Sequence, residues 1–288
     1  MLDWVDTLLQ GILLGGLYSL YATGLSVIFG IMRLVNLAHG DLIVLAAFLM
    51  LALTAVGVPI VLAVAVVVPL MFAAGYALQW ALLNRALGRN ILPPLLITFG
   101  LSIIVQNGLL ETFSADTRRL DVGHLQSASL PLGGGIAVGL MPLICLAAAV
   151  AVIVLLNGVF YRTALGRAFR ATSDDVEIAQ LMGINNKSIY ALTMGIALAV
   201  CAVAGLFLGA RANFDPSIGP ARLLYAFEAV IIGGLGSLWG TLAGGIVVGL
   251  AQTIGAHIDP EWQILSGHVA FLIVLVIRPR GLFPRAVD

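Results

Sequence analysis

The sequence predicts an all-α, polytopic integral membrane protein that forms a single transmembrane domain over residues 1–288. Of its 288 residues, 61% are hydrophobic and only 10% are charged, whereas a soluble domain carries roughly a quarter charged residues. Apolar runs of about 20 residues, the length that crosses a bilayer as an α-helix, recur along the chain. The 14 basic and 14 acidic residues balance, so no excess of positive charge favours nucleic acid as a partner.

We expect about seven full membrane spans. They are residues 8–31, 34–56, 60–83, 93–112, 136–160, 188–210 and 262–277. Charged or chain-breaking residues separate these runs: Arg33, Gly57 with Pro59, Arg85 with Arg89, and the segments 114–135, 161–187, 211–222 and 259–261. Asp3 and Asp6 precede the first run without a basic residue, so this run is expected to be a retained span and not a signal peptide.

The basic residues predict the orientation, because Lys and Arg favour cytoplasmic loops. With the N-terminus outside and the C-terminus inside, ten of the 14 basic residues lie inside. The polar segment 114–135 is then an exposed outer loop, and segment 161–187 is cytoplasmic.

The same orientation constrains the Gly-rich segment 224–256, which would begin and end outside. It is too long for one ordinary span and short for two. We therefore expect a hairpin of two short helices that is broken between Gly233 and Gly240, as at many transport pathways. The alternative is one long tilted helix, which would place the C-terminus outside.

The second half of segment 161–187 is predicted to form a short helix that docks on a partner. Asp174 is the expected N-cap, Glu177 lies three residues later as in a capping box, and Gly183 is a natural C-terminal stop. Val176, Ala179 and Met182 recur at helical spacing and are the expected buried anchors of the docked helix. The residues assigned to coupling are Asp174, Asp175, Val176, Glu177, Ala179, Met182 and Gly183. The alternative is a solvated connector.

Polar residues and glycines within the apolar runs are candidates for lining a solute pathway. They are Asn36, His39, Asp41, Gln106, Asn107, Glu228, Gly233, Gly234 and Gly236. Structural roles compete with this interpretation: the first three could fix helix ends together with Arg33, and the two amides could bond neighbouring helices. Glu228 could be hydrated near the outer interface.

The sequence does not predict an enzyme, and we assign no catalytic residue. HGD at residues 39–41 does not present a base to a nucleophile on another helix. HExxH and phosphate-binding patterns are absent from the sequence. Cys145 and Cys201 lie in apolar runs and are interpreted as buried hydrophobes, so neither a metal nor a cofactor is expected on this chain.

Four separated stretches resemble one family. They are GLYSLYATGLSVIFGIMRLVNLAHGDL, GRAFRATSDDVEIAQLMGIN, AFEAVIIGGLGSLWGTLAGG and RPRGLF. They resemble the permease subunits of branched-chain amino-acid ABC transporters, the hydrophobic amino-acid uptake family, and in particular the shorter H-type permease. The family loop pattern of Glu-Ala-Ala, three residues and Gly is matched by Glu177, Ala179 and Gly183, with Ile178 in place of the first Ala.

The resemblance implies an ATP-driven importer in the bacterial inner membrane. A second homologous permease, two cytoplasmic ATPases that bind ATP and Mg, and a periplasmic solute-binding protein would complete it, with the permeases paired as a heterodimer or a homodimer. Family members carry leucine, isoleucine and valine, and relatives carry urea, short amides or aromatic acids. An ATP-independent channel or facilitator is the alternative from another class, and it would need no docking helix.

Overall fold

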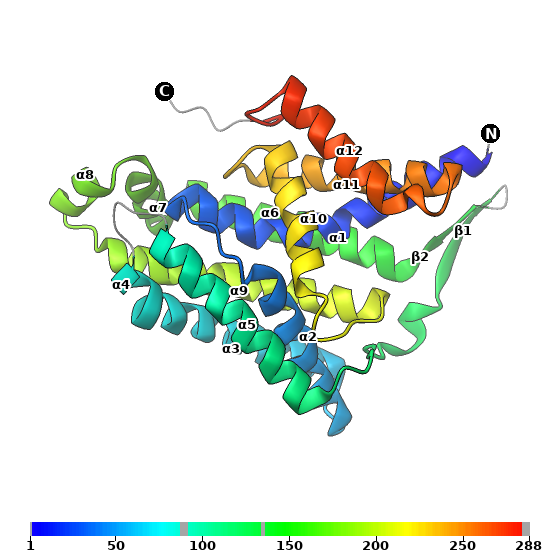
Figure 1. Cartoon of the computed structure of the whole chain (residues 1–288), viewed down its shortest axis with the longest axis horizontal. Helices are drawn as coiled ribbons and strands as arrows, with labels where there is room; N and C mark the ends of the chain where they lie inside the picture. The colour runs from blue at the N-terminus through cyan, green and yellow to red at the C-terminus, as the bar shows by residue number, and fades with distance from the viewer. Residues whose placement is uncertain (1, 87–91, 134–135, 284–288) are drawn as a thin grey trace.

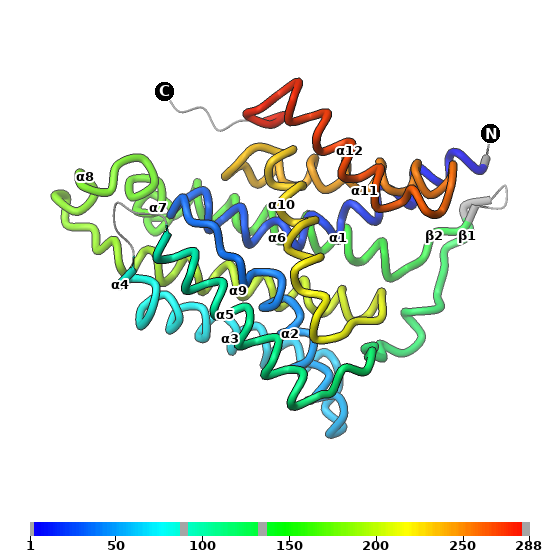
Figure 2. The backbone as a smooth tube through the Cα atoms, in the orientation of Figure 1, coloured from blue at the N-terminus to red at the C-terminus, as the bar shows by residue number. Residues whose placement is uncertain are grey.

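The structure is a computed structural model that describes residues 2–86, 92–133 and 136–283. It is a bundle of helices with one small β-hairpin (Figures 1 and 2). The longer helices are α1 (Leu2–Met32), α2 (His39–Ala55), α3 (Ile60–Leu78), α5 (Leu92–Phe113), α6 (Leu140–Arg162), α9 (Asn186–Arg211), α10 (Gly219–Gly233), α11 (Leu238–Ile258) and α12 (Trp262–Ile277). Arg89 and Arg285, which contribute to the predicted charge asymmetry, lie outside the described residues.

Helices α1 and α9 form the centre of the bundle and run in opposite directions (Figure 1). Both are largely buried inside the protein although their composition would suit a lipid-facing helix. Small residues permit the close packing that drives helix association in membranes. A Cβ built on Gly15 of α1 would lie only 2.5 Å from Ile246 Cα of α11.

The order of elements after each central helix is the same. A short helix, a long helix and an outer helix follow α1 as α2, α3 and α5, and they follow α9 as α10, α11 and α12. Packing repeats as well, because α1 packs against α11 and α10 while α9 packs against α3 and α2. Two antiparallel halves of the same construction therefore surround the centre, with α6 beside both central helices.

The two short helices meet at their N-terminal ends. A Cβ on Gly40 of α2 would lie 2.0 Å from Gly219 O of α10, and a Cβ on Gly219 would lie 1.9 Å from Asp41 Oδ1. With 17 and 15 residues, α2 and α10 extend about 26 and 22 Å, less than the ~30 Å hydrocarbon thickness.

Among the described residues, six helices are long and apolar enough to cross a membrane: α1, α5, α6, α9, α11, and α3 with its continuation through η1 (Gln79–Leu83) and α4 (Asn84–Ala86). Helices α2 and α12 are apolar but shorter. The all-helical polytopic class is confirmed, and the limits predicted for α5 and α12 are correct to within one residue.

Two predicted spans begin too early. Residues 34–38 are apolar but not helical, because Arg33 has a positive φ of 51° and the Asn36 side chain bonds the Ala38 amide. Residues 136–139 are likewise not part of α6 but form strand β2 (Ile136–Gly139), which pairs antiparallel with β1 (Ser129–Gly133). Hydropathy alone cannot separate such segments from the helices that follow them.

Most described residues of the predicted exposed loop 114–135 are exposed, but the loop also has defined structure. It contains a 3-10 turn, η2 (Gly123–Gln126), and strand β1. Arg118 exchanges two backbone hydrogen bonds with Phe214, and the Leu120 amide bonds Gly209 O of α9. Leu120 is fully buried by this contact, so the loop is fixed over the end of α9.

The break predicted in the Gly-rich segment is confirmed. Helix α10 ends at Gly233 and α11 begins at Leu238, and Gly234 and Gly236 have φ values of 104° and 80° that favour glycine. The Ser237 side chain accepts a hydrogen bond from the Gly240 amide and caps α11. The single long helix is therefore excluded. Of the two short helices expected, however, only α10 is short, because α11 has 21 residues and is long enough to cross a membrane.

Candidate functional site

Asp41 is the centre of a buried polar contact between α2 and α5. Ser102 Oγ donates to Asp41 Oδ2 over 2.5 Å, and Gln106 Nε2 donates to Asp41 Oδ1 over 2.9 Å. Gln106 Nε2 also lies 3.2 Å from Ser102 Oγ. Asp41 and Gln106, both predicted pathway residues, therefore contact each other directly. Ser102, which the site prediction does not include, contacts both of them.

Asn107 does not join this contact. Its amide donates to Ile103 O of its own helix over 2.8 Å and the side chain is exposed. Adjacent helix positions point about 100° apart, so Asn107 cannot face Asp41 together with Gln106. Nothing in the described contacts connects Asn107 with the other polar candidates.

Asn36 and His39 fix the start of α2. Asn36 Oδ1 accepts the Ala38 amide. His39 is fully buried, with Nε2 2.8 Å from Tyr21 O of α1 and Nδ1 3.6 Å from Cys201 Sγ of α9. These contacts agree with the alternative in which Asn36 and His39 fix a helix end and do not line a pathway. Arg33 takes no part in the contacts.

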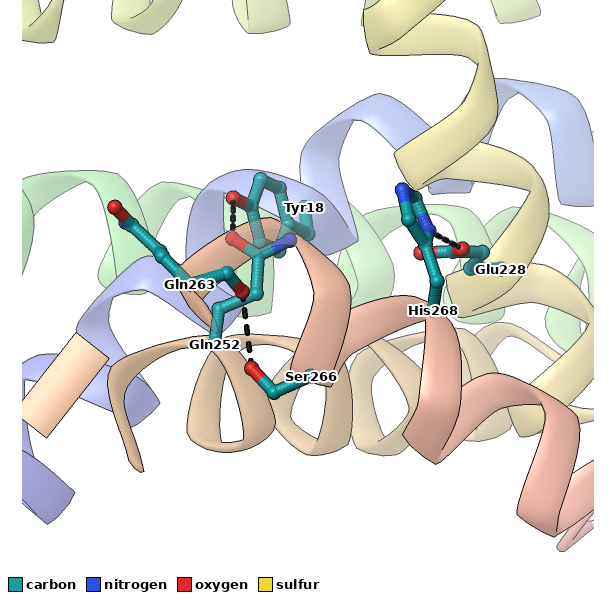
Figure 3. A network of polar contacts seen from close by, with 6 residues as sticks. All are labelled: Tyr18, Glu228, Gln252, Gln263, Ser266 and His268. Atoms are coloured by element: carbon teal, nitrogen blue, oxygen red, sulfur yellow. Dashed lines mark hydrogen bonds and ion pairs between the residues drawn. The ribbon is translucent and has the colours of Figure 1, made fainter. Parts of the chain in front are cut away.

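Glu228 is buried inside the protein, at 2% exposure, and its Oε1 is hydrogen-bonded to His268 Nδ1 of α12 (Figure 3). This burial does not fit the alternative role of Glu228 as a carboxylate hydrated near the outer interface. His268 was missed, although an ionisable side chain within the last apolar run is itself a signal for function. Glu228 Oε2 has no hydrogen-bond partner in the part of the chain that the structure describes.

An aromatic and amide cluster adjoins this pair. Tyr18 donates to Gln252 Oε1 over 2.5 Å, as Figure 3 shows. The Tyr225 ring lies 4.9 Å from the Tyr18 ring and 6.4 Å from the His268 ring, between centroids. Polar groups on α1, α10, α11 and α12 are therefore contiguous in this region.

The two halves of the fold use their carboxylates in the same way. Each short helix carries one buried carboxylate, and polar side chains of the outer helix of that half bind it: α5 binds Asp41, and α12 binds Glu228. Both outer helices are otherwise widely exposed and apolar. The carboxylates thus tether the outer helices to the short ones.

The C-terminal RPRGLF segment packs on the α10–α11 break. The amides of Leu282 and Phe283 donate to the carbonyls of Ile232 and Gly233, over 2.8 and 3.0 Å. A Cβ on Gly281 would lie 2.6 Å from Gly234 Cα. The stretches AFEAVIIGGLGSLWGTLAGG and RPRGLF, which are separate in the sequence, therefore pack together. The RPRGLF segment donates hydrogen bonds to carbonyls at the end of α10 that the helix itself leaves without partners.

Segment 161–187 contains two helices, α7 (Ala164–Asp174) and α8 (Val176–Leu181). Helix α7 was not predicted, although Thr163 is a good N-cap and its Oγ1 accepts the Gly166 amide over 3.0 Å. The N-cap of α8 is Asp175 and not Asp174, because Asp175 Oδ1 accepts the amides of Glu177 and Ile178. The predicted N-cap was thus wrong by one residue, and no capping box forms, because Ile178 and not Glu177 lies three residues after Asp175.

The predicted stop of α8 is confirmed. Gly183 has a φ of 84°, its amide bonds Gln180 O, and the Ile184 amide bonds Ala179 O. This pair of bonds is the Schellman arrangement that ends many helices at glycine.

Two of the three expected anchors, Val176 and Met182, are exposed, and the third, Ala179, is not. Ala179 is 2% exposed and buried within this chain, whereas Ile178, Leu181 and Met182 are 60%, 86% and 77% exposed. Val176 is 43% exposed. A partner would therefore meet Ile178, Leu181 and Met182, which share one face at helical spacing.

Comparison with known proteins gives one consistent family. The family profile described as "Branched-chain amino acid transport system / permease component" matches residues 7–277. The chain belongs to this family. The permease protein BraD of the high-affinity branched-chain amino acid transport system of Pseudomonas aeruginosa is 29% identical over 98% of this chain and 96% of its own length.

LivH, a permease protein of the same kind of system in Escherichia coli K12, is 28% identical over 99% of this permease and 96% of its own length. Among solved structures, PsaBC from Streptococcus pneumoniae in complex with a Fab aligns with a TM-score of 0.51. That alignment covers 95% of this permease and 92% of the PsaBC chain at 15% identity. It is therefore a likeness of fold.

Contacts connect the α7–α8 segment of the permease to the broken hairpin. Ser173 Oγ of α7 donates to Gly30 O of α1 over 2.7 Å. A Cβ on Gly30 would lie 3.0 Å from Gly236 Cα in the break. Helix α7 is therefore connected to the α10–α11 break through two successive contacts, both of which involve Gly30.

Proposed function

We propose that this chain is the membrane-spanning permease subunit of an ATP-driven ABC importer for branched-chain or related small hydrophobic amino acids. The observation that carries the proposal is the match to permease components of branched-chain amino acid transport systems over residues 7–277. The exposed apolar face of α8 supports coupling to an ATPase, because an amphipathic helix docked in a groove suits so short an element. An ATP-independent facilitator would not need such a face.

The proposed assembly contains a second homologous permease in a heterodimer, two cytoplasmic ATPases that bind ATP and Mg, and a periplasmic solute-binding protein, in the inner membrane of a bacterium. We propose that the solute passes along the polar contacts of α2 with α5 and of α10 with α12. Both lie beside exposed outer helices.

The permease co-expressed with the second permease and the ATPases is expected to purify as one complex. In proteoliposomes it should take up labelled leucine only with ATP inside the vesicle and binding protein outside. Omitting the ATPases supplies the control. Equal leucine uptake by the permease chain alone would contradict the ABC mechanism.

We propose that the N-terminus is outside, that the C-terminus and segment 161–187 are inside, and that α10 and α11 form a hairpin that begins and ends on the outer side. The start of α1 and helices α7 and α8 lie at opposite ends of the bundle, which supports this topology (Figure 1). Asp3→Cys and Ala164→Cys should therefore be labelled from opposite sides by a membrane-impermeant maleimide. Both positions are exposed, and the native Cys145 and Cys201 are buried. Labelling from the same side would refute the proposed orientation.

A further inference from the structure

A pocket of about 250 Å³ lies between α1, α6, α7 and the start of α11. It is at the end of the bundle where α7 contacts α1, away from the carboxylate contacts of Asp41 and Glu228. Its walls are largely apolar and include Val27, Ile31, Phe160, Phe169 and Leu238. None of the polar contacts assigned above to the solute path uses this pocket.

Three polar side chains from three helices face this space. Ser26 of α1, Asn157 of α6 and Arg170 of α7 line the pocket together with Ser237, the N-cap of α11, and Trp239 of its first turn. Ser26 is 1% exposed, and its Oγ has no hydrogen-bond partner among the described residues. A buried hydroxyl without a partner costs free energy, which a bound ligand would recover.

The charges around the pocket favour an anion. The Arg170 guanidinium donates to Phe160 O and lies 5.2 Å from the centre of the Tyr161 ring. In the described part of the chain, Arg170 has no carboxylate within 4.0 Å of its side-chain nitrogens. The first turn of the 21-residue α11 adds the positive end of a helix dipole.

The surroundings favour a lipid as the source of that anion. Tyr161 and Trp239 at the pocket are 62% and 47% exposed, and such aromatic side chains are typical of the membrane–water interface. Apolar walls beside a cation suit a ligand with a charged head and an apolar chain. A free inorganic anion would make no use of these walls.

We propose that this pocket binds the phosphate group of an anionic phospholipid. Arg170 and the amides of Leu238 and Trp239 in the first turn of α11 would contact the phosphate. Ser26 and Asn157 would bond its oxygens or the glycerol, and an acyl chain would run along the apolar wall. The bound lipid would touch α1, α7 and the α10–α11 break together, so it would stabilise the connection between the α7–α8 segment and the hairpin.

The test compares purified permease in nanodiscs of phosphatidylcholine alone and with added phosphatidylglycerol. Native mass spectrometry counts retained phosphatidylglycerol, and thermal unfolding reports stabilisation. Arg170→Gln is expected to weaken retention by about tenfold, the loss typical of a charge-assisted hydrogen bond. Arg162→Gln, an exposed arginine of the same segment that does not line the pocket, should retain phosphatidylglycerol as the wild type does.

Ser26→Ala keeps the test independent of folding defects. It removes a hydroxyl that has no hydrogen-bond partner among the described residues, so unfolding in phosphatidylcholine should be unchanged while phosphatidylglycerol retention falls by roughly threefold or more. Equal retention by the wild type, Arg170→Gln and Ser26→Ala would overturn the proposal. A different result would also contradict a lipid ligand: inorganic phosphate stabilises the permease in phosphatidylcholine nanodiscs, and phosphatidylglycerol has no effect. The pocket would then bind a free anion.

Discussion

Gly40→Val is expected to abolish uptake and to lower the yield of folded permease at least tenfold. The first side-chain atom at this position would lie 2.0 Å from Gly219 O and 2.8 Å from the Leu223 amide nitrogen. Both are backbone atoms, so no rotamer change can relieve the clash and α2 must separate from α10. Overpacking in a well-packed core costs about 1–3 kcal/mol, and more where only backbone can move.

The matched control is Gly108→Val on α5. Gly108 is also helical, but no heavy atom lies within 4 Å of a Cβ built there. Its yield, elution volume and unfolding temperature should equal those of the wild type. If Gly40→Val behaves like Gly108→Val in size-exclusion chromatography, thermal unfolding and leucine uptake, the short helices do not meet as the structure has them.

The contact at Gly40 illustrates what the sequence could not predict. Local sequence patterns predict the features that depend on nearby residues. Helix α12 follows from an apolar run. The α10–α11 break follows from the glycine density and the length of its segment. Gly40 and Gly219 meet across 179 positions of sequence. Nothing in either neighbourhood indicates the other, so the crossing of the short helices required the structure.

The same distinction applies to the polar residues. Asp41, Gln106 and Glu228 stand out singly because ionisable and amide groups are rare in apolar runs. Their partners Ser102 and His268 are set by helix packing, which the spacing along the chain does not encode. At α8, two adjacent aspartates precede the helix, and only the backbone geometry selects Asp175 over Asp174 as the cap.

The exposed face of α8 leads to the second large effect, on coupling. Leu181→Arg is expected to reduce ATP-driven leucine uptake at least tenfold while the permease stays folded. Leu181 is 86% exposed, so arginine can be accommodated without disturbing the chain itself. A charge at the centre of an apolar docking face removes an anchor, and anchors commonly contribute about 2 kcal/mol or more to binding.

Ala179→Arg, at an anchor that the helical spacing predicts, is a poorer probe of docking than Leu181→Arg. Ala179 is buried within this chain and its carbonyl accepts the amide of Ile184, so a charge there would disrupt α8 and not only its docking. Loss of uptake in that variant would follow from unfolding of the segment as much as from lost coupling. The exposed position separates the two causes.

Gln180→Arg is the matched control, because it adds the same charge to an exposed polar position next to Leu181. Gln180 lies two positions after Ile178, about 160° around the helix from it, so its side chain lies off the apolar face. Binding-protein-stimulated ATPase activity and leucine uptake are measured together in proteoliposomes. Leu181→Arg should lose both while Gln180→Arg keeps them, because a charge at the rim of a contact changes affinity little. If the two variants transport leucine equally, α8 is a connector and the force from ATP hydrolysis enters the permease elsewhere.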